Sequence, residues 1–197
     1  MKRKRKENQM QLPTTPQLED ALSQEERRKR FRSILRSTVF VLTTVAAVSI
    51  LLATLLFPVM RIYGSSMMPT LEDDEIVVAV KIKEFSTGDL VAFYYNNKLL
   101  IKRVIGKPGD WINITEDGTV YVNGSPLDEP YVSEKSFGTC DLELPYQVPA
   151  DQFFVMGDHR STSIDSRSSV VGCVSKDQIV GRILLRVWPL SKFGPVS

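Results

Sequence analysis

Two residues with the chemistry of a nucleophile and a base, Ser66 and Lys102, stand 36 positions apart in this sequence. Ser66 lies in the run 64–71 of mainly small and apolar residues, and Lys102 follows Leu100 and Ile101 in a segment expected to form a strand. A lysine in an exposed strand is usually a solvated cation. A buried ammonium instead loses hydration, and its pKa falls from about 10.4 to as low as roughly 5 to 6. Because a neutral amine can take the proton of a serine hydroxyl, the pair is a candidate for nucleophilic catalysis.

A third group of polar residues, 157–167, directly follows the apolar run 153–156. Such a group is either a solvated turn or a buried network that supports the serine and the lysine. In a buried network we expect Ser163 to hold the Lys102 amine by a hydrogen bond. The expected ion pairs are Asp165 with Arg167, and Asp158 with Arg103 or Arg160.

Metal and cofactor chemistry have little support in the composition. The chain has one histidine, His159, and two cysteines, Cys140 and Cys173, so the usual ligand sets for zinc, iron and copper are missing. No glycine-rich phosphate loop is present either. We therefore expect neither a metal nor a cofactor. Spacing alone does not fix the geometry of a disulfide, so paired and free thiols both stay open.

An apolar segment, residues 37–60, precedes the candidate nucleophile and contains no charged residue and no histidine. A helix of 24 residues rises about 36 Å, enough for a hydrocarbon core of about 30 Å. The segment is too long for the apolar part of a cleavable signal peptide and follows some three dozen mostly polar residues. We interpret it as an uncleaved anchor, which puts Ser66 at a membrane surface.

The flanks of this anchor differ in charge. Eleven basic and five acidic residues precede it, whereas Arg61 is the only basic residue that follows closely. The positive-inside rule therefore predicts a cytoplasmic amino terminus and an external remainder. The tail, residues 1–36, is expected to be largely disordered up to about Leu22, with a helix from Ser23 whose capping box includes Glu26. Its charge favours contact with anionic lipid over nucleic acid, because no folded basic surface accompanies it.

Residues 61–197 have the texture of strands and turns. Short β-branched and aromatic segments alternate with turn residues, and no segment keeps a period of 3.6 residues. The expected strands are 75–82, 89–95, 99–101, 119–122, 153–156 and 179–187, with a hairpin turn at Asn96–Asn97. The sequence therefore predicts a mainly β protein, an antiparallel β catalytic domain behind one N-terminal transmembrane helix.

The three polar segments, in this order behind an apolar anchor, resemble the type I signal peptidases, membrane-bound serine proteases that release exported proteins from their leader peptides. Residues 66–71 are similar to the family's nucleophile box, 102–110 to its lysine box and 157–167 to its last box. The resemblance implies that Ser66 is the acylated serine and Lys102 the general base. It also implies that residues of the last box support the lysine: Ser163, Asp165 and Arg167. The short spacing between the first two boxes fits the compact, single-anchor form of the family.

Two positions depart from the family pattern. His159 stands where the family usually has asparagine, which suggests a triad of Ser66, His159 and an aspartate, although the intact lysine box disfavours it. Gly64 stands where some members carry a serine whose hydroxyl helps the oxyanion hole. The hole would then depend on backbone N–H groups, that of Ser66 first.

The resemblance further implies acyl transfer without a cofactor, on precursors with small side chains one and three residues before the cut, such as Ala-X-Ala. The substrate would pair as an added strand, with shallow pockets that exclude side chains larger than alanine. The candidate lining residues are Ile62, Tyr63, Met67 and Leu100. The expected partners are signal-peptide-bearing precursors and membrane lipid.

Two other functions fit parts of the pattern. A self-cleaving repressor-type protein uses the same pair of residues on a related β fold, but the anchor and the lack of a DNA-binding domain argue against it. A non-enzymatic β module anchored outside the cell would leave the polar clusters as plain surface. Loss of Ser66 would then change nothing.

Overall fold

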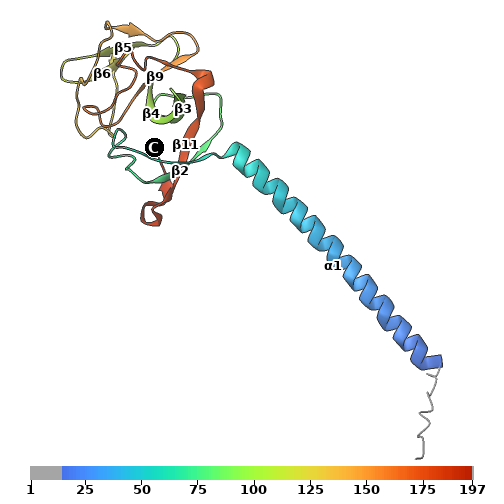
Figure 1. Cartoon of the computed structure of the whole chain (residues 1–197). Coiled ribbons are helices and arrows are strands. Elements are labelled where there is room, and N and C mark those ends of the chain that lie inside the picture. The colour runs from blue at the N-terminus through green and yellow to red at the C-terminus, as the bar shows by residue number, and fades with distance from the viewer. Residues whose placement is uncertain (1–14, 197) are drawn as a thin grey trace, which may run out of the picture. The chain divides into compact units, whose positions relative to one another are not determined.

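A computed structural model of the protein describes residues 15–196 and begins with one long helix (Figure 1). This helix, α1, spans Thr15–Leu56 and runs through Ser23, where a helix start was expected. Pro16 stands in its first turn, where the missing N–H of proline breaks no intrahelical hydrogen bond. Disorder was expected up to about Leu22, but residues 15–22 belong to α1, and residues 1–14 lie outside the described residues.

The carboxyl end of α1 lies four residues before the predicted end of the anchor. The helix ends at Leu56, because Pro58 disfavours helical geometry in the residue before it. Met60, assigned to the anchor from the sequence, instead lies in the first strand and is only 8% exposed. The 20 residues 37–56 still rise about 30 Å, the thickness of a hydrocarbon core. Leu22–Leu56 qualifies as a candidate membrane span, with a mean hydropathy of 2.5.

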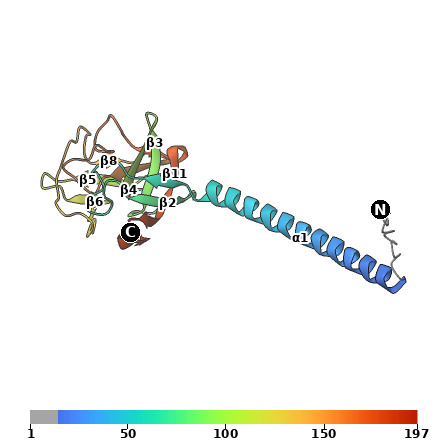
Figure 2. The same ribbon diagram turned by 60° about the horizontal axis from the view of Figure 1, so that its bottom comes forward.

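The chain divides into two compact units between Leu52 and Ala53, inside α1. The second unit contains two antiparallel sheets (Figure 2). The larger has the order β1-β2-β11-β3-β4-β9-β10, with β12 paired to β11, and the smaller has the order β7-β6-β5-β8. Every strand pair within residues 15–196 is antiparallel, which confirms the mainly β fold class.

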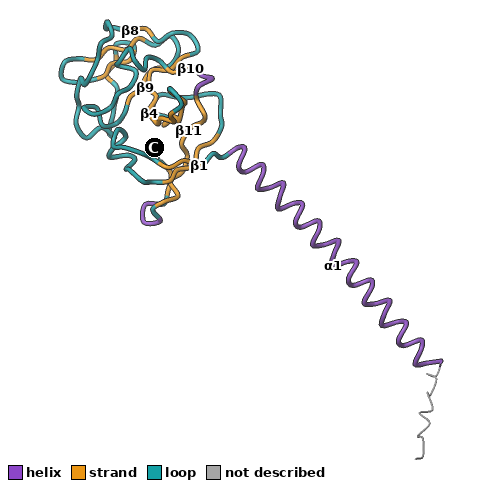
Figure 3. Tube along the Cα trace, in the orientation of Figure 1, coloured by secondary structure: helices purple, strands orange, loops and turns teal. Residues whose placement is uncertain are grey.

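In the larger sheet β2, β3, β9 and β11 match the expected segments, β4 continues five residues beyond the expected 99–101, and β1, β10 and β12 were not expected. Its strands are β1 Val59–Arg61, β2 Ile76–Val80, β3 Leu90–Tyr95, β4 Lys98–Gly106, β9 Gln152–Met156, β10 Val174–Ser175, β11 Ile179–Trp188 and β12 Gly194–Pro195. The smaller sheet consists of β5 Trp111–Ile114, β6 Val120–Val122, β7 Ser125–Pro126 and β8 Tyr146–Gln147. Loops and two short 3₁₀ helices, η1 Lys176–Gln178 and η2 Leu190–Lys192, make up the remainder (Figure 3).

Two strands of the larger sheet have backbone edges that pair on one side only. The hairpin β3–β4 turns at Asn96 and Asn97, whose φ angles of 45° and 61° are those of a tight type I′ turn. On its other side β4 pairs with β9 only from Arg103 onward, so residues 99–102 pair with β3 alone. β1 is the end strand of the sheet order and pairs with β2.

The two sheets share a core at the carboxyl end of β4. Side chains of Ile105, Phe154 and Met156 from the larger sheet form one buried cluster with Ile112 and others from the smaller. Gly106 allows this close approach, since a Cβ there would lie 2.6 Å from Ile112 Cδ1.

The cysteines left open by the sequence are both free thiols, and burial raises the pKa of Cys173 to about 11. Within residues 15–196, no group of three or more histidine, cysteine or acidic side chains is placed to hold a metal ion.

Candidate active site

The structure brings the two candidate catalytic side chains together. Ser66 lies in the turn that follows β1, and Lys102 lies in β4 opposite Val91 of β3. Lys102 Nζ donates a hydrogen bond to Ser66 Oγ over 2.7 Å. At this distance a proton can pass between the two atoms without an intervening water.

Burial of Lys102 determines its charge. The residue is 3% exposed, and this desolvation lowers the pKa of its amine from the ordinary value to about 8. Three nearby charges contribute smaller effects: Asp165 raises the pKa, Arg167 lowers it and Asp158 raises it. Desolvation dominates because removing an ammonium from water costs more than these flanking charges return. A substantial share of Lys102 is therefore neutral near physiological pH.

The turn that carries Ser66 is held from its amino-terminal side by a carboxylate. The Gly64 N–H donates to Asp73 Oδ1 over 2.7 Å, and Gly64 has a φ of 89°, a conformation that favours glycine. The Gly64 N–H, a candidate donor of the oxyanion hole, is therefore already occupied in this structure. By contrast, the Ser66 N–H has no hydrogen-bond acceptor among the described residues and is open to a substrate oxygen.

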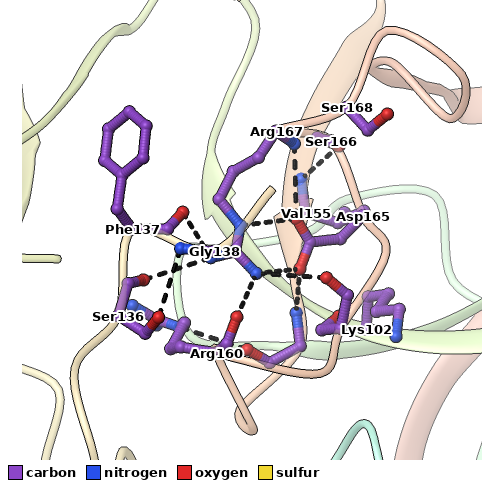
Figure 4. Close-up of polar contacts among 12 residues, drawn as sticks. Lys102, Ser136, Phe137, Gly138, Val155, Arg160, Asp165, Ser166, Arg167 and Ser168 are labelled. Carbon is purple, nitrogen blue, oxygen red and sulfur yellow. Dashed lines mark hydrogen bonds and ion pairs between the residues drawn. The ribbon is translucent and has the colours of Figure 1, made fainter. Parts of the chain in front are cut away.

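The expected ion pair of Asp165 with Arg167 is present and completely buried. Arg167 Nε and Nη2 donate to the two carboxylate oxygens over 2.8 and 2.9 Å. Arg167 also donates to the main-chain oxygens of Phe137 and Arg160, so that one guanidinium joins two loops (Figure 4). Asp165 Oδ2 in turn accepts a hydrogen bond from the Gly157 N–H over 2.9 Å.

Asp158 pairs with Arg103, the first of the two partners that the sequence allowed. Arg103 Nε and Nη2 donate to its carboxylate over 2.9 and 2.7 Å, and Thr70 Oγ1 donates to it over 2.5 Å. Arg103 is the neighbour of Lys102 in β4, and Thr70 follows Ser66 by four residues. This pair therefore joins the strand of the lysine to the segment of the serine.

Ser163 and His159 do not make the contacts predicted for them. Among residues 15–196, Ser163 Oγ is buried without a hydrogen-bond partner, so its expected bond to Lys102 is not formed. His159 Nδ1 is also buried with no partner in this part of the chain, and the His159 main-chain N–H donates to the Ser66 carbonyl oxygen over 3.1 Å. His159 thus contacts the backbone of Ser66 rather than its hydroxyl, and no Ser–His–Asp triad is assembled among residues 15–196.

A cleft of about 660 Å³ opens beside the pair, between the segment 59–67 and the amino-terminal half of β4. All four candidate substrate-contacting residues line it: Ile62, Tyr63, Met67 and Leu100. Ile62 and Met67 also belong to the core, with 5% and 2% exposure, whereas Tyr63 is 79% exposed. The cleft wall is thus rigid at its base and open at its rim.

No residue of the loop 128–132 was predicted from the sequence to support the site. Glu129 forms a buried ion pair with Arg160, and the ring of Tyr131 lies over the Arg103 guanidinium at 3.7 Å. The only local signal was an acidic residue followed by proline and tyrosine in a loop, and this pattern alone gives no partner. Asp73, the acceptor for Gly64, was also missed.

The chain is similar to known proteins over this whole region. A family model described as "Signal peptidase, peptidase S26" matches residues 34–188. Signal peptidase IB of Staphylococcus aureus strain COL is 40% identical over 153 residues, 67% of this chain and 78% of the relative. Signal peptidase I of Leptolyngbya laminosa is 36% identical over 149 residues, 68% of this chain and 70% of the relative.

A solved structure, the crystal structure of a signal peptidase I from Enterococcus faecalis V583, is 30% identical with a TM-score of 0.42. The match covers 52% of this chain and 98% of that structure. The sequence matches extend from the second half of α1 through β11, and they define a membrane-associated serine protease. The chain belongs to the signal peptidase family, peptidase S26, whose members remove signal peptides from precursor proteins.

Proposed function

We propose that this signal peptidase cuts exported precursors with Ser66 as the nucleophile and neutral Lys102 as the general base, after small-X-small sites such as Ala-X-Ala. The observation that carries the proposal is the 2.7 Å hydrogen bond between a buried lysine and a serine at the end of a cleft. Burial supplies the neutral amine, and the cleft supplies room for an extended peptide.

The reaction is acyl transfer in two steps. Lys102 takes the hydroxyl proton while Ser66 Oγ attacks the scissile carbonyl, and the oxyanion accepts a hydrogen bond from the open Ser66 N–H. The Lys102 ammonium then gives its proton to the leaving amine, and the C–N bond breaks. In the second step Lys102 takes a proton from water, which attacks the ester. The bond between the acyl carbon and Ser66 Oγ breaks, and the Lys102 ammonium returns the proton to Ser66 Oγ. No cofactor takes part.

The substrate enters as an added strand between two unsatisfied backbone edges. Residues 99–102 of β4 and the outer edge of β1 both line the cleft or adjoin it. Main-chain hydrogen bonds to these edges provide affinity, while Ile62, Met67 and Leu100 shape shallow pockets. Because Ile62 and Met67 are packed in the core, the pockets cannot widen, and side chains larger than alanine are excluded by sterics.

The protein is anchored by α1 with its amino terminus in the cytoplasm and the β domain outside. The eleven basic residues that precede position 37 support this orientation. They also favour contact of the tail with anionic lipid at the cytoplasmic surface. Protease added outside intact cells is expected to digest from the carboxyl side and to spare residues 1–36. A protected carboxyl terminus would contradict the orientation.

A single cleavage experiment in detergent tests the mechanism, with an Ala-X-Ala precursor supplied as a separate molecule. The wild-type chain is expected to cut it, and Ser66→Ala and Lys102→Ala are each expected to lose nearly all activity, since the two residues act as a unit. A self-cleaving protein would fragment itself and leave the precursor intact. A binding module would leave both chains whole. Full activity of Lys102→Ala would contradict the assignment of the base.

A further inference from the structure

The loop 128–132 contacts two buried arginines, Arg160 and Arg103. Glu129 binds Arg160 through both carboxylate oxygens: Arg160 Nη2 donates to Oε1 over 2.5 Å, and Nη1 donates to Oε2 over 3.1 Å. The side chains of this pair are 1% and 0% exposed. A bidentate, desolvated pair of this kind fixes both partners in position.

The second connection runs through Tyr131. Its hydroxyl donates to Glu129 Oε1 over 3.2 Å, and its ring covers the Arg103 guanidinium at 3.7 Å from the centroid. Arg103 cannot move away on its other sides, because Nη1 donates to the Gly88 carbonyl oxygen and Nε to Asp158. The loop thus holds the arginine of β4 and the arginine that follows β9 at the same time.

Arg160 contacts the backbone that supports the serine, and Arg103 is the neighbour of the lysine in β4. Arg160 Nε donates to the Gly157 carbonyl oxygen over 3.1 Å. Gly157 is packed so closely against Ser66 that a Cβ on it would lie 2.5 Å from the Ser66 carbonyl oxygen. Arg103 adjoins Lys102 in the same strand. A shift of either arginine therefore changes the distance between Ser66 Oγ and Lys102 Nζ.

We infer that Glu129 and Tyr131 are positioning residues for the Ser66–Lys102 pair, an inference that rests on the proposed function. They touch neither reacting atom. They hold Arg103 and Arg160, which hold the strand of the base and the loop beneath the nucleophile. Small displacements in such an arrangement reduce kcat by as much as about 100-fold while leaving substrate contacts in place.

The test measures kcat and KM of the full chain in detergent, with each preparation normalised by titration with a stoichiometric serine-directed inhibitor. Glu129→Gln keeps the size of the side chain and removes its charge, and it is expected to lower kcat about 10- to 100-fold with KM within about twofold of wild type. Asp128→Asn is the matched control, because Asp128 is the exposed neighbouring carboxylate, and its kcat is expected to be unchanged.

Two substitutions at position 131 separate the ring from the hydroxyl. Tyr131→Phe keeps the ring over Arg103 and is expected to retain kcat within about threefold, whereas Tyr131→Leu removes the ring and is expected to lose about tenfold. If Glu129→Gln does not fold, the comparison of Tyr131→Phe with Tyr131→Leu tests the inference on its own. Equal kcat values for Phe and Leu at position 131 would overturn the role of the ring.

The pH profile separates a positioning role from a loss of folded protein. Less folded enzyme lowers the activity at every pH equally and does not shift the profile. Asp165, Arg167 and Asp158 influence the pKa of Lys102 in the wild-type protein, where Glu129 balances the charge of Arg160. Without Glu129, the unbalanced charge of Arg160 offsets the attraction of Asp158, so the acid limb of kcat/KM is expected to move to lower pH. A normal kcat and an unmoved limb in Glu129→Gln would overturn the inference while Ser66→Ala stays inactive. Cleavage by Ser66→Ala would instead refute the proposed function.

Discussion

Ser66 and Lys102 are hydrogen-bonded to each other, yet the polar contacts around them differ in exposure. The turn of the serine is held by contacts at the surface: Asp73 accepts from Gly64, and Arg61 pairs with Asp74. The lysine lies among buried pairs of arginine and carboxylate, Arg103–Asp158 and Arg167–Asp165. A base whose function depends on desolvation needs surroundings closed to water, whereas a nucleophile that meets a peptide needs an open face. Changes on the buried side should therefore cost more than changes on the exposed side.

The largest expected effect is on stability, from Asp165→Ala. This substitution leaves the Arg167 guanidinium buried without a counter-charge and the Gly157 N–H without its acceptor, so we expect a loss of about 3 to 5 kcal/mol in the free energy of unfolding. Both tryptophans, Trp111 and Trp188, lie in the β domain, so denaturant unfolding followed by their fluorescence reports on this domain.

Asp177→Ala serves as the control for this measurement, because Asp177 is an exposed carboxylate away from the site. It is expected to change the free energy of unfolding by no more than about 0.5 kcal/mol. Equal losses in the two variants would mean that the buried pair contributes no more than a surface charge.

Gly157→Ala is expected to cause the next largest effect, on activity. An added Cβ would lie 2.2 Å from Ser163 Oγ and 2.5 Å from the Ser66 carbonyl oxygen, so the backbone of the serine must move. We expect kcat to fall about 100-fold, as for other misplacements near 1 Å. Gly172→Ala tests whether alanine itself is the cause, because a Cβ at Gly172 meets no atom within 4 Å, although its φ of 63° adds local strain. A wild-type kcat in Gly157→Ala would show that the segments of Ser66 and Gly157 can move apart without loss of activity.

The third effect is on the pH dependence: below the pKa of Lys102, activity is expected to change about tenfold for each pH unit. If neutral Lys102 is the base, as we propose, kcat/KM is expected to rise with pH, to bend near a pKa of about 8 and to level off above it. Steady-state cleavage of the precursor between about pH 6 and pH 10 measures this curve. A curve that bends near the histidine reference of about 6.5 and disappears in His159→Ala would favour the triad instead.

The smallest effect is expected on the exposed side. Asp73→Ala removes the acceptor of the Gly64 N–H, and we expect kcat/KM to fall only about 2- to 10-fold, since the N–H can bond to water instead. Asp73→Asn keeps an acceptor oxygen and is expected to restore most of the activity. If Asp73→Ala lost as much activity as Gly157→Ala, the exposed contacts of the serine turn would matter as much as the buried ones around the lysine.

The sequence allowed the contact of Ser66 with Lys102 and the long strands of the larger sheet to be predicted, because these features are local. Ser66 and Lys102 each lie in a distinctive short segment, and strands such as β3 and β11 are rich in apolar, aromatic or β-branched residues. Their 2.7 Å contact and the pairing of Asp158 with Arg103 agree with what was expected from those segments.

Other features depend on partners distant in the chain, and the sequence could not supply them. Glu129 and Arg160 are 31 residues apart, and nothing near Glu129 distinguishes it from the exposed Asp128. The end of the anchor was placed too late because apolar residues suit both a bilayer and a sheet core, and Met60 belongs to the second. The orientation of the Ser163 hydroxyl depends on packing against Gly157, which no pattern records.

The joint between α1 and β1 limits where the enzyme can work. Only Phe57 and Pro58 separate the two elements, and this joint is itself tied down: Leu56 and Pro58 accept hydrogen bonds from the backbone of residues 81 and 79. Ten residues from Leu56 to Ser66 span at most about 33 Å. If α1 is the membrane anchor that we propose, Ser66 stays within this reach of the bilayer, where a precursor held by its own apolar segment has a high effective concentration. A longer, flexible joint would dilute the site by roughly the −3/2 power of its length, with every catalytic contact unchanged.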